Sequence, residues 1–491
     1  MRTLPVLLSF VFLVACSGDG EKSDTNVSAD TDTDTDSDSD TDTDTDTDTD
    51  TDTDTGSVEL VGYAFPSRDG SGNNSVSFSG QTFRHILIAD QSTFIADLTD
   101  RLNGGYFPAP GDVTQDLDFY FRFDSAVGGP IPHSIDSDPA PVQTTYDDIN
   151  ADKNLVEKLA GNDEVGQHAD WSTAFRGWTD PAVTTPETLV ELWFAELDAA
   201  AVAWSNGTFP LTPEGIPVAS VYVTADGRDL RQLTEKFVRV GIAYSQAADD
   251  YLDDDTDGKG LLADHSAVEK GKTYTALEHA WDEGFGYTGM TPTYGDWTRP
   301  QQTEGVVDDN GDGAIDLLSE HAFHLAINAP KRDDGSASGT TFATDLFDAF
   351  HAGRSLLADT TGPLTPGELE ELRQHRNDVL EAWETLLAAN VIHYINETLA
   401  DTDAIGTVDY VFEDHAKHWS EMKGFALGFQ FSRLSTLNEV QFIQLNTLLG
   451  QRPAIASDGQ PAIDAYRQDL LDARDLLQAA FFLDPSDVEA W

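Results

Sequence analysis

The chain has 491 residues, of which 88 are acidic and 28 are basic, and it carries a formal net charge of −60 and a single cysteine. This charge argues against binding to nucleic acid, which needs a cationic surface, and against docking on anionic lipid through a basic patch. One cysteine excludes a disulfide framework and a thiolate zinc cage. An apolar fraction of 39% is enough to bury the core of one large domain or two moderate ones.

The N-terminus has the features of a bacterial lipoprotein signal peptide. Arg2 supplies a positive charge, and residues 4–15 form an apolar run that is too short to span a bilayer. The run ends in Leu13-Val14-Ala15-Cys16, which resembles the lipobox, and Ser17 follows it as in outer-membrane lipoproteins. We therefore expect residues 1–16 to be a signal peptide and Cys16 to carry the lipid. The expected location is the outer membrane, at the cell surface or on the periplasmic face.

Residues 17–56 are dominated by Thr-Asp and Ser-Asp dipeptides. Such a segment has almost no apolar surface and repels itself, so we predict a disordered, extended tether. The acidic repeat can also adsorb calcium weakly at many points, but the simpler interpretation is a stalk between the membrane and the folded domain.

The remaining chain is predicted to be mainly α, a helical bundle, most simply two packed bundles, after an irregular Gly-, Pro- and Asp-rich N-terminal region. A strand-like run covers 58–63, and the folded domain is expected to span 57–485. Apolar residues recur at helical spacing in ten segments. These segments are 84–102, 187–204, 229–252, 274–285, 316–329, 342–357, 366–400, 411–432, 437–449 and 462–482. Thr365-Pro366-Gly367-Glu368 is a capping box with proline at the first helical position.

The segment 308–320 resembles a calcium-binding loop of the EF-hand type. Its first residues read D-D-N-G-D-G-A-I-D, with oxygen-bearing side chains at alternate positions, a glycine for the sharp turn and an apolar Ile315 after it. Position twelve holds Ser319, and the acid follows one residue late. The alternative is a solvated turn before a helix. The expected calcium ligands are Asp308, Asn310, Asp312, Ala314 (through its carbonyl oxygen), Asp316 and Glu320.

A second stretch, 253–258, reads D-D-D-T-D-G and has Asp264 at position twelve. It has Gly260 where the apolar residue is expected. A second calcium loop and a plain acidic loop are equally compatible with this sequence.

Two predicted helices combine histidine with carboxylates. Imidazole and carboxylate together suit iron, zinc or manganese, and two such helices facing each other would form a metal site inside a bundle. Helix caps, buried histidines and salt bridges use the same spacings, so a purely structural role is the alternative. The candidate transition-metal ligands are Glu278, His279, Asp282 and Glu283 on the first helix, and His415, His418 and Glu421 on the second.

Several segments resemble a family of bacterial lipoprotein domains of unknown function that is distantly imelysin-like. They are 76–84, 224–230, 277–287, the calcium-type loop continuing through 326–333, and 393–396. The resemblance implies a mainly helical two-bundle fold in a surface or periplasmic lipoprotein, without an established activity. Imelysin-like proteins carry a Gly-x-His-x-x-Glu motif and are associated with iron uptake. Here His279 and Asp282 keep part of that motif, and Leu277 replaces the glycine.

Three functions follow as hypotheses. The first is a surface-anchored, calcium-stabilised binding lipoprotein that takes part in metal acquisition, with an outer-membrane receptor or transporter as partner. The second is a lipoprotein that binds a glycan or a protein partner and has no transition-metal site. The third is a metallohydrolase, but His-Glu-x-x-His and Gly-x-Ser-x-Gly are both absent from the sequence, so we expect no enzyme.

Overall fold

A computed structural model describes residues 62–491 apart from 69, 128–129, 151 and 164–166. By its internal contacts the chain divides into two units, Met1–Asp52 and Thr53–Trp491. The predicted signal peptide, Cys16 and the predicted tether lie outside the described residues. Most of the strand-like run at 58–63 also lies outside them, and its last two residues, Gly62 and Tyr63, form a bend.

The described residues form 14 α-helices and isolated β-bridges but no strand, so the prediction of a mainly helical bundle is confirmed. The first seven helices are α1 (Ser79–Asn103), α2 (Asp112–Phe121), α3 (Trp171–Ala174), α4 (Pro186–Ser205), α5 (Leu230–Arg239), α6 (Ala276–Gly286) and α7 (Arg299–Glu304). The other seven are α8 (Leu325–Gly335), α9 (Phe342–Asp359), α10 (Pro366–Ala404), α11 (Phe412–Ala426), α12 (Glu439–Leu449), α13 (Gln460–Phe481) and α14 (Pro485–Ala490). In this part of the chain, none of the helices combines the length and the apolar character that crossing a membrane requires.

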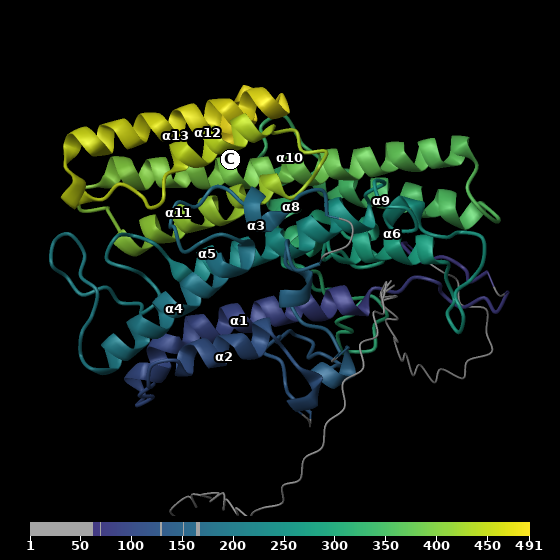
Figure 1. Ribbon diagram of the computed structural model, residues 1–491, viewed down its shortest axis with the longest axis horizontal. Coiled ribbons are helices and arrows are strands. Elements are labelled where there is room, and N and C mark those ends of the chain that lie inside the picture. Colours follow the sequence, from purple (N-terminus) through teal and green to yellow (C-terminus); the bar gives the residue numbers. More distant parts are fainter. Residues whose placement is uncertain (1–61, 69, 128–129, 151, 164–166) are drawn as a thin grey trace, which may run out of the picture. The chain divides into compact units, whose positions relative to one another are not determined.

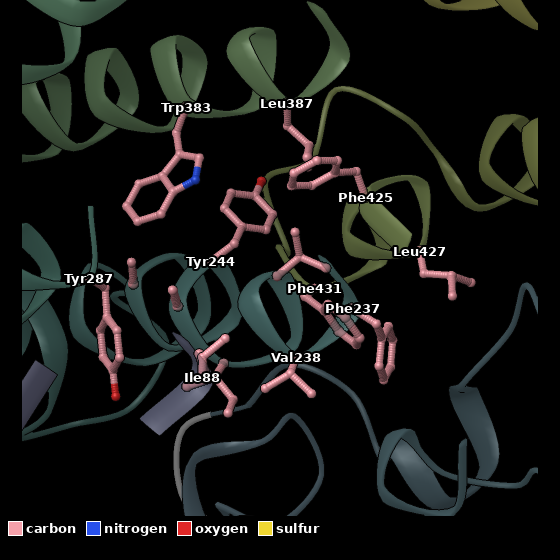
Figure 2. Close-up of a cluster of buried hydrophobic side chains, with 14 of the residues drawn as sticks. Ile88, Phe237, Val238, Tyr244, Tyr287, Trp383, Leu387, Phe425, Leu427 and Phe431 are labelled. Atoms are coloured by element: carbon pink, nitrogen blue, oxygen red, sulfur yellow. The ribbon is translucent and has the colours of Figure 1, made fainter. Parts of the chain in front are cut away.

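The helices of the second unit pack in a continuous series (Figure 1). Helix α2 packs on α1, α1 on α5, α5 on α11, and α11 on the long helix α10, which also contacts α13. Helices α8 and α9 pack on α10 as well, and α9 covers α6. One hydrophobic core runs through all of these helices. Figure 2 shows a part of it in which Tyr244, Trp383, Leu387 and Phe425 approach one another from three segments.

Helix boundaries that depend on local chemistry agree with the sequence prediction. At the start of α10, the Thr365 N–H donates to Glu368 Oε2 at 2.7 Å, and the Glu368 N–H donates to Thr365 Oγ1 at 3.3 Å. This reciprocal pair is the capping box that the sequence predicts, because both partners lie within one turn.

Helix α2 was not predicted, and its cap comes from a distant part of the chain. The Asp198 carboxylate on α4 accepts hydrogen bonds from the N–H groups of Gly111 and Val113, at 2.9–3.0 Å. A carboxylate at a helix N-terminus is stabilising because the first N–H groups have no partner inside the helix. This cap lies 85 residues away from Val113 in sequence, which explains why the local pattern did not indicate it.

The helix predicted at 316–329 is wrong in its boundaries, since α8 begins only at Leu325. Residues 317–320 form a single turn, and β-bridges flank this turn on both sides. Ile315 bridges to Pro141, and His321 bridges to Val306. Because the backbone of His321 pairs with Val306, the turn does not continue into the helix, which starts only after this bridge.

The predicted helix 229–252 is present but changes its winding. After α5, two π-helical segments follow, Val240–Tyr244 and Ala247–Tyr251. Short π-helical insertions occur often at functional sites, and these two segments place buried polar side chains in the core.

Candidate functional site

The calcium-type loop is held in shape by its own side chains. Asp308 accepts hydrogen bonds from the N–H groups of Gly311 (2.7 Å) and Gly313 (3.0 Å). Asn310 Oδ1 accepts from the Asp312 N–H at 2.8 Å, and Asp312 Oδ1 accepts from the Ala314 N–H at 2.9 Å. Both glycines have left-handed backbones, with φ of 71° and 85°. Each turn that the sequence pattern requires is therefore formed.

The late acid also reaches the loop. Glu320 is buried, its Oε1 accepts from the Asn310 N–H at 3.1 Å, and its Oε2 accepts from the Asp316 N–H at 2.9 Å. Ile315, the apolar residue of the loop, is fully buried. Asp316 accepts from Gln143 Nε2 at 2.8 Å. Although Glu320 comes one residue after position twelve, its carboxylate therefore still contacts the loop backbone.

No ion pair among the described residues neutralises the acidic groups of this loop, Asp308, Asp312, Asp316 and Glu320. Carboxylate and amide oxygens on a turn of this kind are the ligands that Ca²⁺ prefers. The residue types therefore suit a calcium ion, but the carboxylates bond to the loop's own N–H groups and, in the described part of the chain, are not gathered around one point.

The second acidic loop is different, because arginines bind it. Asp254 lies 2.7 Å from both Arg373 and Arg433, and Asp253 pairs with Arg433. Although burial opposes ionisation, these arginines lower the pKa of Asp254. This arrangement favours the plain acidic loop over a second calcium site.

On α6 the predicted metal ligands Glu278 and Asp282 are bound to a buried arginine of α9. Arg354 is fully buried, with Nε 2.9 Å from Asp282 Oδ1 and Nη1 3.2 Å from Glu278 Oε1. Arg68 adds a 2.9 Å contact to Glu278, and the Tyr63 hydroxyl donates to Asp282 at 3.0 Å. Burial raises the pKa of Asp282 to about 6, and Arg354 opposes that rise. Two of the predicted ligands are thus already neutralised by protein cations.

The other two candidates on α6 are less constrained. The His279 ring stacks on Tyr274 with a centroid distance of 4.3 Å, and its Nε2 lies 3.8 Å from Glu283 Oε2. Glu283 accepts a hydrogen bond from Gln81 Nε2 at 2.8 Å. The α6 candidates that do not bind an arginine are therefore one histidine and one carboxylate, on adjoining turns of the helix.

On α11 the three candidates have separate partners. His415 is buried, its Nδ1 lies 3.2 Å from the Tyr410 hydroxyl, and burial lowers its pKa to about 4. His418 Nδ1 lies 2.8 Å from Asp401 Oδ2. Although burial opposes protonation, this contact raises the pKa of His418. Glu421 Oε1 accepts from the Tyr394 hydroxyl at 3.2 Å and lies 3.5 Å from Lys236 Nζ.

The structure does not bring α6 and α11 together. Helix α6 packs on α9 and α1, whereas α11 packs on α10 and α5, and the two lie apart in Figure 1. Within the described ranges, no group of three or more His, Cys, Asp or Glu side chains is arranged to hold a metal ion. The single site between facing helices is therefore not formed by these residues.

Sequence reasoning missed a groove on the described part of the chain. It has a volume of about 440 Å³ and lies between α3 with its flanking residues and the segment 429–442. Trp171, Phe429 and Phe442 contribute apolar walls. The groove's polar lining consists of His168, Arg176, Gln430, Ser432, Arg433, Ser435, Asn438 and Glu439.

His168 at this groove is oriented by a buried carboxylate. Its Nδ1 lies 2.7 Å from Asp249 Oδ1, and Asp249 also accepts from the His168 N–H at 3.2 Å. Burial raises the pKa of Asp249 to about 6, and the contacts with His168 oppose that rise. A carboxylate on one ring nitrogen fixes the tautomer and leaves the other nitrogen for a further partner. The two residues are 81 positions apart, and Asp249 belongs to a π-helical segment, so no local motif indicates the pair.

Comparison with curated proteins and with solved structures gave no match. A protein family described as Domain of unknown function (DUF4856) matches residues 167–444. The matched region includes α6, the loop at 308–320, α11 and every residue that lines the groove. Because the match covers more than half of the chain, the protein belongs to this domain family of unknown function.

Proposed function

We propose that the protein is a membrane-anchored binding lipoprotein, stabilised by calcium, that holds its ligand in the groove beside His168. The single observation that carries this proposal is the groove itself. Its volume of about 440 Å³ lies within the range of small-molecule sites, and it combines apolar walls with several hydrogen-bonding side chains.

The polarity of the groove favours a neutral, hydroxyl-rich ligand such as a glycan fragment. Its two arginines are already engaged, since Arg176 donates to the carbonyl oxygens of Thr173 and Phe175, and Arg433 binds Asp253 and Asp254. Gln430, Asn438 and Ser435 also bond within the chain, to Arg176, Gln441 and Glu384. The Glu439 carboxylate and His168 Nε2 make no hydrogen bond within the described part of the chain and are open to a ligand. These groups match hydroxyls better than they match a charged ligand.

A glycan array probed with the full chain tests this assignment. We expect selective binding, and Glu439→Ala is expected to weaken it about tenfold, since a hydrogen bond to a charged group contributes about 1.5 kcal/mol or more. Glu371→Ala, an exposed acid of α10 outside the groove, is the matched control. An array without binding, or Glu439→Ala binding as well as the wild type, would contradict the proposal.

The anchor rests on the N-terminal sequence. Cys16 is the only cysteine and stands at the end of the apolar run, where lipidation is expected. Cys16→Ser should shift the protein from the membrane fraction to the soluble fraction and abolish labelling by a fatty-acid probe. Unchanged fractionation would contradict lipidation at this position.

The distant imelysin-like relationship and a role in metal acquisition remain proposals of lower rank. Both proposals are supported by the proximity of His279 to Glu283. These two residues do not share a metal site with the candidate ligands on α11. An outer-membrane receptor or transporter would be the partner in that case. Stoichiometric iron or zinc in the purified protein would raise this second function above glycan binding.

A further inference from the structure

A second groove lies next to the groove beside His168, because the segment 432–438 lines both of them. We call this segment the dividing segment. The second groove has a volume of about 380 Å³ and lies between the dividing segment, α10 and the end of α13. This volume is within the range of small-molecule sites. Its lining includes Leu434, Phe481, Phe482, Asn377, Glu381 and Thr385.

The two grooves share the dividing segment as a wall. Leu434 and Thr436 line the second groove. The groove beside His168 is lined instead by Ser432, Arg433, Ser435 and Leu437. The Phe429 ring in the wall of the first groove also contacts the Phe481 ring in the wall of the second, with a centroid distance of 5.7 Å. A single segment of chain therefore separates the grooves.

The dividing segment is fixed in place by α10. Glu384 of α10 is buried, and its carboxylate accepts hydrogen bonds from the Thr436 N–H at 2.7 Å and from the Ser435 hydroxyl. Arg433, Leu434 and Thr436 are nevertheless exposed to solvent. A ligand that crosses a wall of this kind contacts groups that are already held in position, so little ordering is required on binding.

Phe482 in the second groove is exposed although it is aromatic. It is 93% exposed, and it ends α13 with a left-handed backbone at φ of 53°. Glycine is the usual residue at such a helix end, because a side chain strains this conformation. Neither the exposure of the ring nor its backbone conformation benefits the fold. Exposed apolar groups in a groove are typical of a surface that binds a ligand.

The polar groups of the second groove suit a neutral ligand. Within the described part of the chain, the Glu381 carboxylate and the Thr385 hydroxyl make no hydrogen bond. Asn377 accepts a hydrogen bond from Arg376 Nε at 2.8 Å, and its amide N–H groups are open in the same part of the chain. None of the described residues that line this groove is a lysine, an arginine or a histidine. As in the first groove, such donors and acceptors match hydroxyls.

We propose that the second groove is a further subsite for the glycan, so that the ligand is a neutral oligosaccharide that crosses the dividing segment. This inference rests on the proposed function, because the groove beside His168 has to bind the first part of the same sugar chain. The apolar face of a sugar ring can stack on the exposed ring of Phe482, while its hydroxyls bond to Glu381 and Thr385. The exposed Glu381 disfavours an anionic glycan.

An array of neutral glycans printed as length ladders, from the monosaccharide to the octasaccharide, tests the proposal with the full chain. Calorimetric titration with the members of the bound ladder then measures affinity against length. In the wild type we expect affinity to rise about fivefold or more from the short to the long members. Phe482→Gly should abolish this rise and bind the short members like the wild type, whereas Phe482→Trp should keep the rise. Phe107→Ala removes another exposed phenylalanine, outside both grooves, and is the matched control.

A stability measurement separates binding from folding. Phe482→Gly relieves the left-handed conformation, so its melting temperature should equal or exceed that of the wild type. A purely structural role of the ring would lower the melting temperature instead, and that result would overturn the proposal.

The outcomes distinguish the second subsite from the proposed function on which it rests. An array on which no ladder binds would contradict both. Binding that does not strengthen with length, or a full rise in Phe482→Gly, would overturn the second subsite and leave the groove beside His168 as the glycan site. A wild-type dimer that Phe482→Gly converts to a monomer in sedimentation would assign the second groove to another copy of the chain and would overturn the subsite as well.

Discussion

The loop at 308–320 and the inner face of α6 are both rich in carboxylates, but the charges of the two regions are balanced differently. On α6, Glu278 and Asp282 bind the guanidinium of Arg354, which is fully buried. In the loop, the acids accept hydrogen bonds from N–H, hydroxyl and amide groups, and no cationic side chain of the described residues pairs with them. The comparison shows that similar carboxylate clusters are paired with a buried arginine in one region and with N–H groups in the other, so carboxylate spacing alone does not identify a metal site.

The largest expected effect is the loss of Arg354. Arg354→Met leaves Glu278 and Asp282 in the core without their main cation, and we expect it to lower the free energy of unfolding by about 3 kcal/mol or more. Chemical denaturation followed by circular dichroism measures this change. Arg467→Met, at an exposed ion pair, should cost about 0.5 kcal/mol or less. Equal effects of the two substitutions would contradict the structural role of the α6 carboxylates.

A second prediction concerns how a histidine on α11 makes the stability of the fold depend on pH. His415 has a pKa of about 4 in the folded protein because it is buried, whereas an unfolded histidine titrates near 6.5. Between these values the unfolded chain binds more protons, so stability falls as the pH drops. The cost amounts to about 2 kcal/mol at pH 5.

His415→Gln should flatten this part of the stability profile, measured as melting temperature against pH. His418 has the opposite sign, because its pKa is raised in the fold. Its stabilising contribution to the folded protein is present at low pH and is lost as the pH rises through that raised pKa. A wild-type profile that His415→Gln leaves unchanged would show that His415 is not a buried neutral histidine.

The smallest expected effect belongs to His279. Its ring stacks on Tyr274 and is partly exposed, so His279→Ala should cost about 1 kcal/mol. We expect no change in the metal content of the purified protein, alone or combined with His418→Ala. Loss of a bound transition metal in either variant would revive the metal site predicted from the sequence.

The sequence predicts those features that depend on neighbours within a few residues. The capping box at Thr365 and Glu368, the turns of the loop at 308–313 and most helix positions are of this kind. The remaining features depend on partners that fold in from far away. Asp198 caps α2, and Asp249 orients His168, from 81 or more residues away, and Arg354 reaches Glu278 across 76 residues. Local periodicity contains no information about such pairs.

The most direct test of the account is the metal content of the full chain purified without chelator, followed by calorimetric titration of the stripped protein with calcium. We predict one calcium ion per chain, a rise in melting temperature on binding, and loss of both in Asp312→Asn. Asp254→Asn, in the loop that arginines already neutralise, should bind calcium like the wild type. Absence of calcium, or iron or zinc that disappears with His279→Ala, would contradict the distinction between the two carboxylate regions.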